Sequence, residues 1–331
     1  MREAKLRQHT WDRRFSYSVI KHQHKAEPFA KALRKAGVFQ NNYGYGDVTL
    51  LDKDWASVVT KKMHPIGERQ HNRGSVVVLY PHSAVLPWWY DGIFEPQEFV
   101  ACLFVVAEGQ KEGTKLFYNK RVETCGWPWS PQKDFSLPSG ESVLFAPIHP
   151  SKKDLRVEAI EANASIQEEL LKMNAKVTCR YIGELEHQGI EYTDKWIWVK
   201  GGPDGSYSDI DRADVVIAEG TFMYLSVARG KPTIGINQHL PMRSNARELD
   251  AERPHNWHKY GDDIAYPINY SEGNLKRLID WATKEEQTEW RRRFIGKSLE
   301  PRQFTRTIID IYKEETKRRG IQIKRSVPNR V

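Results

Sequence analysis

Three residues in the second half of the chain, Glu219-Gly220-Thr221, interrupt an apolar stretch in a way that suits the binding of a diphosphate or a ribose. They fall where an apolar run ends and a helical spacing begins. Backbone N–H groups are unpaired at such a turn, and the positive end of the helix dipole lies behind them. Gly220 lets a ligand approach the backbone, and the Thr221 hydroxyl can cap the helix. A Gly-Thr pair is also an ordinary turn and N-cap, so the pattern alone leaves both interpretations open.

The elements around this turn are predicted from the spacing of apolar residues. Residues 215–218 are β-branched and too few for a helix, which predicts a strand buried on both faces. Residues 222–228 have helical spacing, and Arg229-Gly230 provides a basic last turn followed by a glycine. A second apolar strand is expected at 233–236. The stretch therefore predicts a βαβ unit.

This stretch resembles the donor-binding half of GT-B glycosyltransferases, a half shared by the UDP-sugar 2-epimerases and the polyol-phosphate transferases. The resemblance implies that the glycine turn receives the ribose and diphosphate of a nucleotide sugar, and that a Gly-Lys-Pro run begins the next strand. It is looser over the rest of the second half, and the first third of the chain matches in layout only. The residues that carry it are Ala213-Asp214-Val215-Val216-Ile217-Ala218-Glu219-Gly220-Thr221 and Ala228-Arg229-Gly230-Lys231-Pro232-Thr233-Ile234.

The chain of 331 residues is long for a single core, because such cores stop growing at roughly 250–300 residues. Strands and helices alternate, which favours parallel sheets. The proline- and glycine-rich segment 126–140 is the best candidate for a linker. We therefore expect an α/β chain with two Rossmann-like domains facing a cleft. Residues 1–135 would form the acceptor side and 136–295 the donor-binding domain; the resemblance implies that a helix within 296–331 crosses back.

Further donor-binding residues are expected at turns that follow predicted strands. In the resembled families the first turn of the second domain contacts the donor phosphates, and His149 and Lys152 fall at that position. Gly202 follows a strand expected at 196–199, and Gln238 follows the strand at 233–236. The full set of predicted donor-binding residues is His149, Lys152, Gly202, Glu219, Gly220, Thr221 and Gln238.

The acceptor side offers three candidates for a general base. His82 follows a buried strand expected at 76–80, and tryptophans lead from it to Asp91, which predicts a polar spot with apolar walls. A histidine that caps a helix, with tryptophans on an interdomain surface, fits the same pattern. His24 is expected in a loop after the first strand, before a helix with Pro28 in its first turn. We rank His82 first, then Asp91 and His24. A retaining reaction would need no side-chain base in that role.

No metal or resident cofactor is expected. Asp209-Ile210-Asp211 has the spacing of a metal-binding DxD motif, but acids commonly begin a short helical turn just before a strand. GT-B enzymes also generally need no bound metal. His255 and His258 lack further nearby ligands. The nucleotide-diphosphate sugar would be a co-substrate.

The composition excludes an integral membrane protein. Charged residues make up 28% of the chain, the mean hydropathy is −0.66, and no apolar run approaches the ~20 residues that span a bilayer. The first residues carry charge but no apolar core, so we expect no secretory signal. Three widely spaced cysteines fit the reduced thiols of a cytoplasmic protein.

Part of the formal net charge of +8 is concentrated near the C-terminus. Such a surface attracts phosphate-rich partners such as nucleic acid, anionic lipid or nucleotide, although a solvated tail has the same composition. No acid follows Glu315, and the cations there are Lys317, Arg318, Arg319, Lys324, Arg325 and Arg330.

The sequence thus predicts transfer of a sugar or related group from a nucleotide-diphosphate donor to an acceptor hydroxyl, with DNA as one candidate acceptor. Backbone amides and basic side chains would stabilise the charge on the leaving diphosphate while a base takes the acceptor proton. Two alternatives stay open. One is a nucleotide-sugar 2-epimerase, and the other is a nucleic-acid-binding protein without transferase activity.

Overall fold

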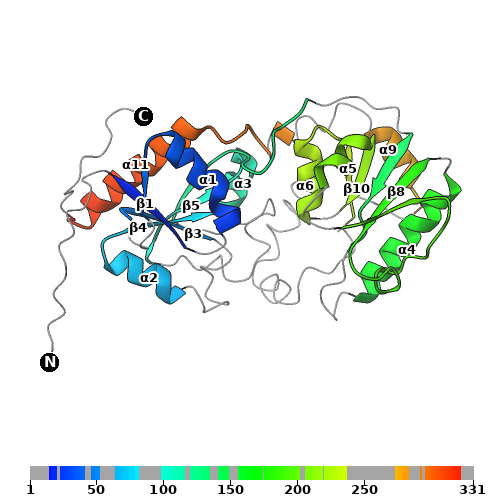
Figure 1. The fold of residues 1–331 in the computed structure, drawn as a ribbon, viewed down its shortest axis with the longest axis horizontal. Helices are drawn as coiled ribbons and strands as arrows, with labels where there is room; N and C mark the ends of the chain where they lie inside the picture. The colour runs from blue at the N-terminus through cyan, green and yellow to red at the C-terminus, as the bar shows by residue number, and fades with distance from the viewer. Residues whose placement is uncertain are drawn as a thin grey trace.

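The structure is a computed structural model, and it describes only part of the chain. The described residues are 15–20, 23–41, 46–52, 64–81, 98–115, 120–134, 141–148, 156–173, 175–201, 206–218, 220–236, 273–282, 291–292 and 295–321. Within these ranges the chain forms two parallel β-sheets in separate lobes, and helices pack on the faces of each sheet (Figure 1).

The first sheet has six parallel strands in the order β2-β1-β3-β4-β5-β6. Its strands are β1 (Ser16–Ile20), β2 (Phe39–Gln40), β3 (Val48–Asp52), β4 (Val76–Tyr80), β5 (Val100–Val105) and β6 (Arg121–Thr124). The helices between them are α1 (Gln23–Lys35), α2 (His64–Asn72) and α3 (Glu108–Lys115). The winding reverses between β1 and β3, as in doubly wound folds of the flavodoxin type.

The second sheet has five parallel strands in the order β11-β10-β7-β8-β9. Its strands are β7 (Ser142–Phe145), β8 (Lys176–Tyr181), β9 (Ile197–Lys200), β10 (Val215–Ala218) and β11 (Thr233–Gly235). Its helices are α4 (Arg156–Lys172), the short 3-10 helix η5 (Glu186–Gln188), α5 (Ser206–Arg212), α6 (Gly220–Ala228) and α9 (Leu275–Ala282). The winding reverses between β7 and β10, so the expected βαβ unit β10-α6-β11 lies beside the first strand of its sheet.

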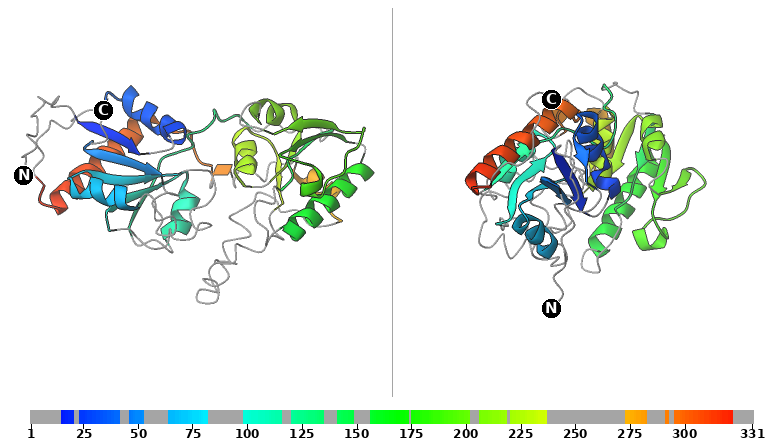
Figure 2. Two further views of the ribbon diagram at one scale, coloured as in Figure 1. Left: turned by 60° about the horizontal axis from the view of Figure 1, so that its bottom comes forward. Right: turned by 60° about the vertical axis from the view of Figure 1, so that its left-hand side comes forward.

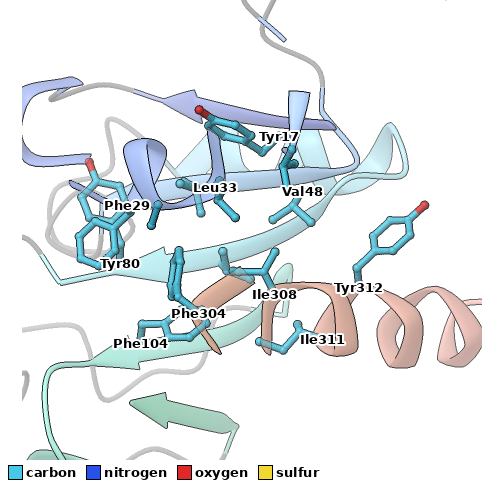
Figure 3. Packing of buried hydrophobic residues seen from close by; sticks show 14 of the residues in the cluster. Tyr17, Phe29, Leu33, Val48, Tyr80, Phe104, Phe304, Ile308, Ile311 and Tyr312 are labelled. Atoms are coloured by element: carbon cyan, nitrogen blue, oxygen red, sulfur yellow. The ribbon is translucent and has the colours of Figure 1, made fainter. Parts of the chain in front are cut away.

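The last helix, α11 (Pro301–Arg318), returns to the first lobe, which confirms the expected crossing. Figure 3 shows Phe304 and Ile308 of α11 packed with Phe29 of α1 over the strands. The Phe29 and Phe304 ring centroids are 5.6 Å apart. Helices α1 and α11 thus cover one face of the first sheet, and the core on its other face includes Ile66 of α2.

Two connections join the lobes, and they run side by side (Figure 2). The Trp127 N–H donates to the Lys297 carbonyl at 2.8 Å, and the Leu299 N–H donates to the Trp127 carbonyl at 2.9 Å. The change from one sheet to the other falls between Thr124 and Ser142. The proposed domain limits at 135 and 295 stay predictions.

Most of the described side chains of helix α6 are buried, and Phe222 and Leu225 are partly buried, which fits its nearly continuous apolar sequence. Met223, Tyr224 and Val227 are fully buried. They belong to a cluster with Val216 of the sheet and Trp127 of the first connection. The helix therefore lies between the sheet and the connections. The opposite face of the sheet is covered by α4 and α9.

One prediction about the first lobe needs revision. The expectation that His24 lies in a loop is wrong, because α1 begins at Gln23 and Pro28 is its sixth residue rather than part of its first turn. The helical apolar pattern already starts at the buried Ala26, and it extends α1 ahead of Pro28 at the cost of one backbone hydrogen bond.

None of the helices in the described ranges is long and apolar enough to cross a membrane. All three cysteines are buried and free of disulfides. Burial raises the pKa of the Cys179 thiol to about 12, so this thiol stays protonated at neutral pH.

Candidate functional site

The strand order of the second sheet changes direction between β7 and β10, and this topological switch point marks the candidate site. Strand β7 pairs with β8 on one side and with β10 on the other. Ligands of doubly wound sheets bind outside the carboxyl ends of the strands at such a reversal. One residue after the last paired residue of β7, the Ala146 N–H donates to the Ile217 carbonyl at 2.8 Å. This bond holds the carboxyl ends of β7 and β10 together. The turns that follow β7 and β10 both contain predicted donor-binding residues.

Helix α6 begins at Gly220, directly beyond the carboxyl end of β10. Strand β10 is buried along its whole length and pairs in parallel with β11, with Val216 opposite Thr233. The helix ends at Ala228, and Gly230 just beyond it has a φ of +73°, the left-handed conformation predicted for this position. The βαβ unit is therefore confirmed, and the first backbone N–H groups of α6 lie beyond the carboxyl end of β10, a position that suits an anion.

A buried cation that the sequence did not reveal lies beside this first turn. Arg180 of β8 has a side chain that is only 5% exposed, and it forms an ion pair with Asp209 of α5. Its guanidinium carbon is 5.9 Å from the centre of the Phe222 ring, two residues beyond Gly220. Arg180 therefore places a guanidinium, paired with Asp209, close to Phe222 in the first turn of α6. The available signal was an arginine between Cys179 and Tyr181, near the end of a strand whose other charged residue is its first, Lys176.

A second residue missed in the sequence fixes the segment after β7. Asn163 of α4 is fully buried, and its side-chain amide bonds both backbone groups of Ile148. It accepts from the Ile148 N–H and donates to the Ile148 carbonyl, both at 2.9 Å, and it also donates to the Gln188 carbonyl at 2.9 Å. The chain is thus anchored one residue before His149.

The two acids of the Asp209-Ile210-Asp211 motif face cations. Asp209 pairs with Arg180, and Asp211 accepts from Arg229 and from Lys133, the latter at 2.9 Å. The hydrogen bond from Arg229 holds the pKa of the Asp211 carboxyl below its usual value. No three His, Cys, Asp or Glu side chains in the described part of the chain are grouped to hold a metal. The expected metal independence stays a prediction.

The reversal of winding in the first sheet lies between β1 and β3. Asp52 is the last residue of β3 and is fully buried. The Tyr80 hydroxyl of the neighbouring strand β4 donates to Asp52 Oδ2 at 3.4 Å. The sequence alone did not reveal this buried carboxylate at the end of a strand. β1 leads to His24 and β4 leads to His82, so the elements before both histidines lie on either side of Asp52.

The structure locates only some of the predicted site residues. Gly220 and Thr221 are the first two residues of α6, and His24 is the second residue of α1; their side chains lie outside the described part. Seven other predicted residues also lie outside the described residues, and their roles stay predictions. They are His82, Asp91, His149, Lys152, Gly202, Glu219 and Gln238.

A separate cavity of about 600 Å³ lies at the amino ends of strands in the first sheet, opposite to their carboxyl ends. Its lining includes Val100, Lys120 and Arg121 at the amino ends of β5 and β6, together with Glu315 and Arg318 of α11. It is therefore distinct from the carboxyl ends of the strands, where both reversals of winding lie.

Comparison with solved structures identifies the architecture. The glycosyltransferase SnogD from Streptomyces nogalater superposes with a TM-score of 0.51 over 90% of this chain and 98% of its own, at 12% identity. A Listeria monocytogenes protein assigned as a UDP-N-acetylglucosamine 2-epimerase gives 0.51 over 91% and 96%, at 11% identity. The fold is GT-B-like. Both likenesses establish the GT-B fold alone, because the identities are so low.

Other comparisons add little to this. TarM superposes with a TM-score of 0.46 at 11% identity, over 82% of this chain, and the chain spans only 56% of the length of TarM. No protein-family model matches the sequence, and no curated protein matches it.

Proposed function

We propose that this protein transfers a sugar from a nucleotide-diphosphate donor to an acceptor hydroxyl. The observation that carries the proposal is the reversal of winding between β7 and β10, with the N-terminus of α6 at its carboxyl edge. Backbone N–H groups and a helix dipole at that position suit an anionic diphosphate. The GT-B fold supports the proposal, because its two sheets supply one site for a donor and one for an acceptor.

The donor side would stabilise the leaving group. As the bond between the sugar carbon and the phosphate oxygen breaks, its electron pair passes to the diphosphate. The amides of the first turn of α6 and the charge of Arg180 would stabilise that developing charge. Arg180 is already held by Asp209 and packed near Phe222, so little reorganisation is needed during the reaction.

The acceptor side would supply the base. The acceptor oxygen forms the new bond to the sugar carbon, and its proton passes to a side chain. His82 stays our first choice, with Asp91 and His24 behind it. Asp52 joins these candidates because a buried carboxylate lies at the reversal of winding in the first sheet, where the Tyr80 hydroxyl orients it.

Donor binding is tested by thermal unfolding with a panel of nucleoside diphosphates and their sugars. A ligand at 100 times its Kd stabilises the folded state by about 2.7 kcal/mol. We expect a shift with at least one nucleotide, and we expect Gly220→Val to remove it by filling the turn. Ser206→Val, at the first residue of the neighbouring helix α5, is the control that keeps the shift. A full shift in Gly220→Val would exclude this turn as the binding site.

Epimerisation of the nucleotide sugar is the second candidate, because the Listeria monocytogenes protein superposes as well as SnogD does. Incubation with donor alone separates the two. A transferase releases nucleoside diphosphate slowly as water replaces the acceptor. An epimerase instead produces a second nucleotide sugar whose diphosphate link is intact.

A further inference from the structure

The outer side of helix α11 carries a row of cations. Arg302, Arg306, Lys313 and Lys317 are all exposed. At 3.6 residues per turn they fall within an arc of about 60° around the helix, and they extend over about 22 Å along its axis. We name these four residues the α11 basic stripe.

These cations differ from the other basic residues of the same helix. Arg318 pairs with Glu315, and the neighbouring Arg319 donates to the Ser75 and His71 carbonyls. No ion pair with an acid of the described residues involves a member of the α11 basic stripe. Two acids of this helix neighbour the stripe: Asp310, three residues before Lys313, and Glu314, three residues before Lys317, which pairs with Arg121. The stripe therefore keeps most of its positive charge available for a partner.

Helix α1 extends the same surface. It packs beside α11 on one face of the first sheet, where Phe29 meets Phe304 (Figures 1 and 3). Its exposed Lys31 and Lys35 are one turn apart and lie opposite the buried Phe29 and Leu33 on the helix. The cations of both helices therefore point away from the sheet.

The chemistry of this face favours nucleic acid over a membrane. Helices that bind a bilayer bury exposed apolar residues in it. The large apolar side chains exposed in the described residues do not include any from α1 or α11. Phosphates follow one another at about 3.4 Å along each strand of a duplex, so a row of about 22 Å lies within reach of several phosphates. We propose that the α11 basic stripe binds the phosphate backbone of duplex nucleic acid.

This proposal is independent of sugar transfer, because the stripe is on the helix layer of the first lobe and the donor turn is in the second. Four phosphate contacts give a slope of about −3.6 for log K against log salt. The affinity should therefore fall about 150-fold between 50 and 200 mM salt.

The test is fluorescence anisotropy of a labelled 20-base-pair DNA with the full-length protein. The variant Arg302→Glu, Arg306→Glu, Lys313→Glu, Lys317→Glu should lose at least about 100-fold in affinity at 50 mM salt. The control reverses four exposed cations of the second lobe: Lys176→Glu, Lys195→Glu, Lys276→Glu and Arg277→Glu. Net charge and C-terminal tail are then equal in both variants, so only the position of the reversed charges differs. The control should bind within a few-fold of the wild type.

Three results would overturn the proposal: no binding at 50 mM salt, equal losses in the two variants, or binding to vesicles with anionic lipid in place of the duplex. Substitution of the same four residues by glutamine provides a milder second variant if the charge reversal impairs folding. The nucleotide-induced thermal shift, measured in parallel, shows whether the donor site is intact and separates this proposal from the proposed function.

Discussion

Arg180 and Asp209 form a buried ion pair that joins strand β8 to helix α5 beside the first turn of α6. Their side chains are 5% and 11% exposed. Removal of one partner leaves a buried charge without its counterion. We expect Arg180→Met to lower the free energy of unfolding by about 3–5 kcal/mol. Urea unfolding followed by circular dichroism measures this.

The control for this prediction is the double variant Arg180→Met, Asp209→Leu. It removes both charges and should recover much of the stability lost in the single variant. A double variant as unstable as the sum of the two single variants would show that the pair is not coupled. Nucleotide affinity should be lower than in the wild type in both the single and the double variant, because the Arg180 guanidinium near α6 is absent from each.

Asp52, the buried carboxylate at the carboxyl end of β3, is expected to contribute to the chemical step. General base catalysis typically contributes 10²–10⁴-fold in rate, so Asp52→Asn should lower kcat by about that range and change KM little. Tyr80→Phe removes only the hydroxyl that orients the carboxylate and should cost less. Measurement of donor turnover with both variants tests this, and an unchanged kcat in Asp52→Asn would return the role to His82.

Gly230 is expected to be more sensitive to substitution than Gly37. Both lie two residues beyond the end of a helix and have a positive φ, +73° for Gly230 and +80° for Gly37. The left-handed conformation costs a residue with a side chain roughly 1–2 kcal/mol, and Gly37→Ala meets nothing else within 4 Å. A Cβ at Gly230 would lie 2.3 Å from the Asp134 carbonyl oxygen. Gly230→Ala should therefore destabilise clearly more than Gly37→Ala in thermal unfolding, because the first connection packs against the end of α6.

Asp211 should make stability depend on pH in the acid range. The hydrogen bond from Arg229 lowers its pKa in the folded state. A carboxyl with a lowered folded pKa contributes stability above its unfolded pKa, near 3.8, and this contribution disappears as the pH falls through the folded value. Asp211→Asn should cost about 1 kcal/mol at pH 7, and progressively less as the pH falls below the unfolded pKa. A loss that stays constant as the pH is lowered would contradict this.

The sequence predicted what depends on local spacing. The β10-α6-β11 unit, with Gly230 at its turn, follows from apolar period and turn chemistry within a short stretch. The resemblance, rather than spacing, predicted the return of α11. His24 was misplaced because Pro28 usually marks the first turn, whereas Ala26 and Phe29 extend the helical packing ahead of it.

The parts of the site that were missed depend on contacts distant in sequence. Arg180 became a candidate because it contacts Asp209 and Phe222. Asp52 became one because the Tyr80 hydroxyl donates to it. Neither pair has a spacing that a single sequence reveals. The order of the strands could not be predicted either, because the two reversals of winding depend on which strands pair with each other and not on composition.

The packing of α11 against the first lobe has a consequence for how the chain folds during translation. Phe304 and Ile308 share a hydrophobic cluster with Phe29, although nearly the whole chain separates them. The N-terminal lobe is made first, yet it lacks one layer of its interior until the final helix leaves the exit tunnel. The second lobe, whose strands and helices are all synthesised earlier than α11, should therefore be the first to reach its native packing during translation.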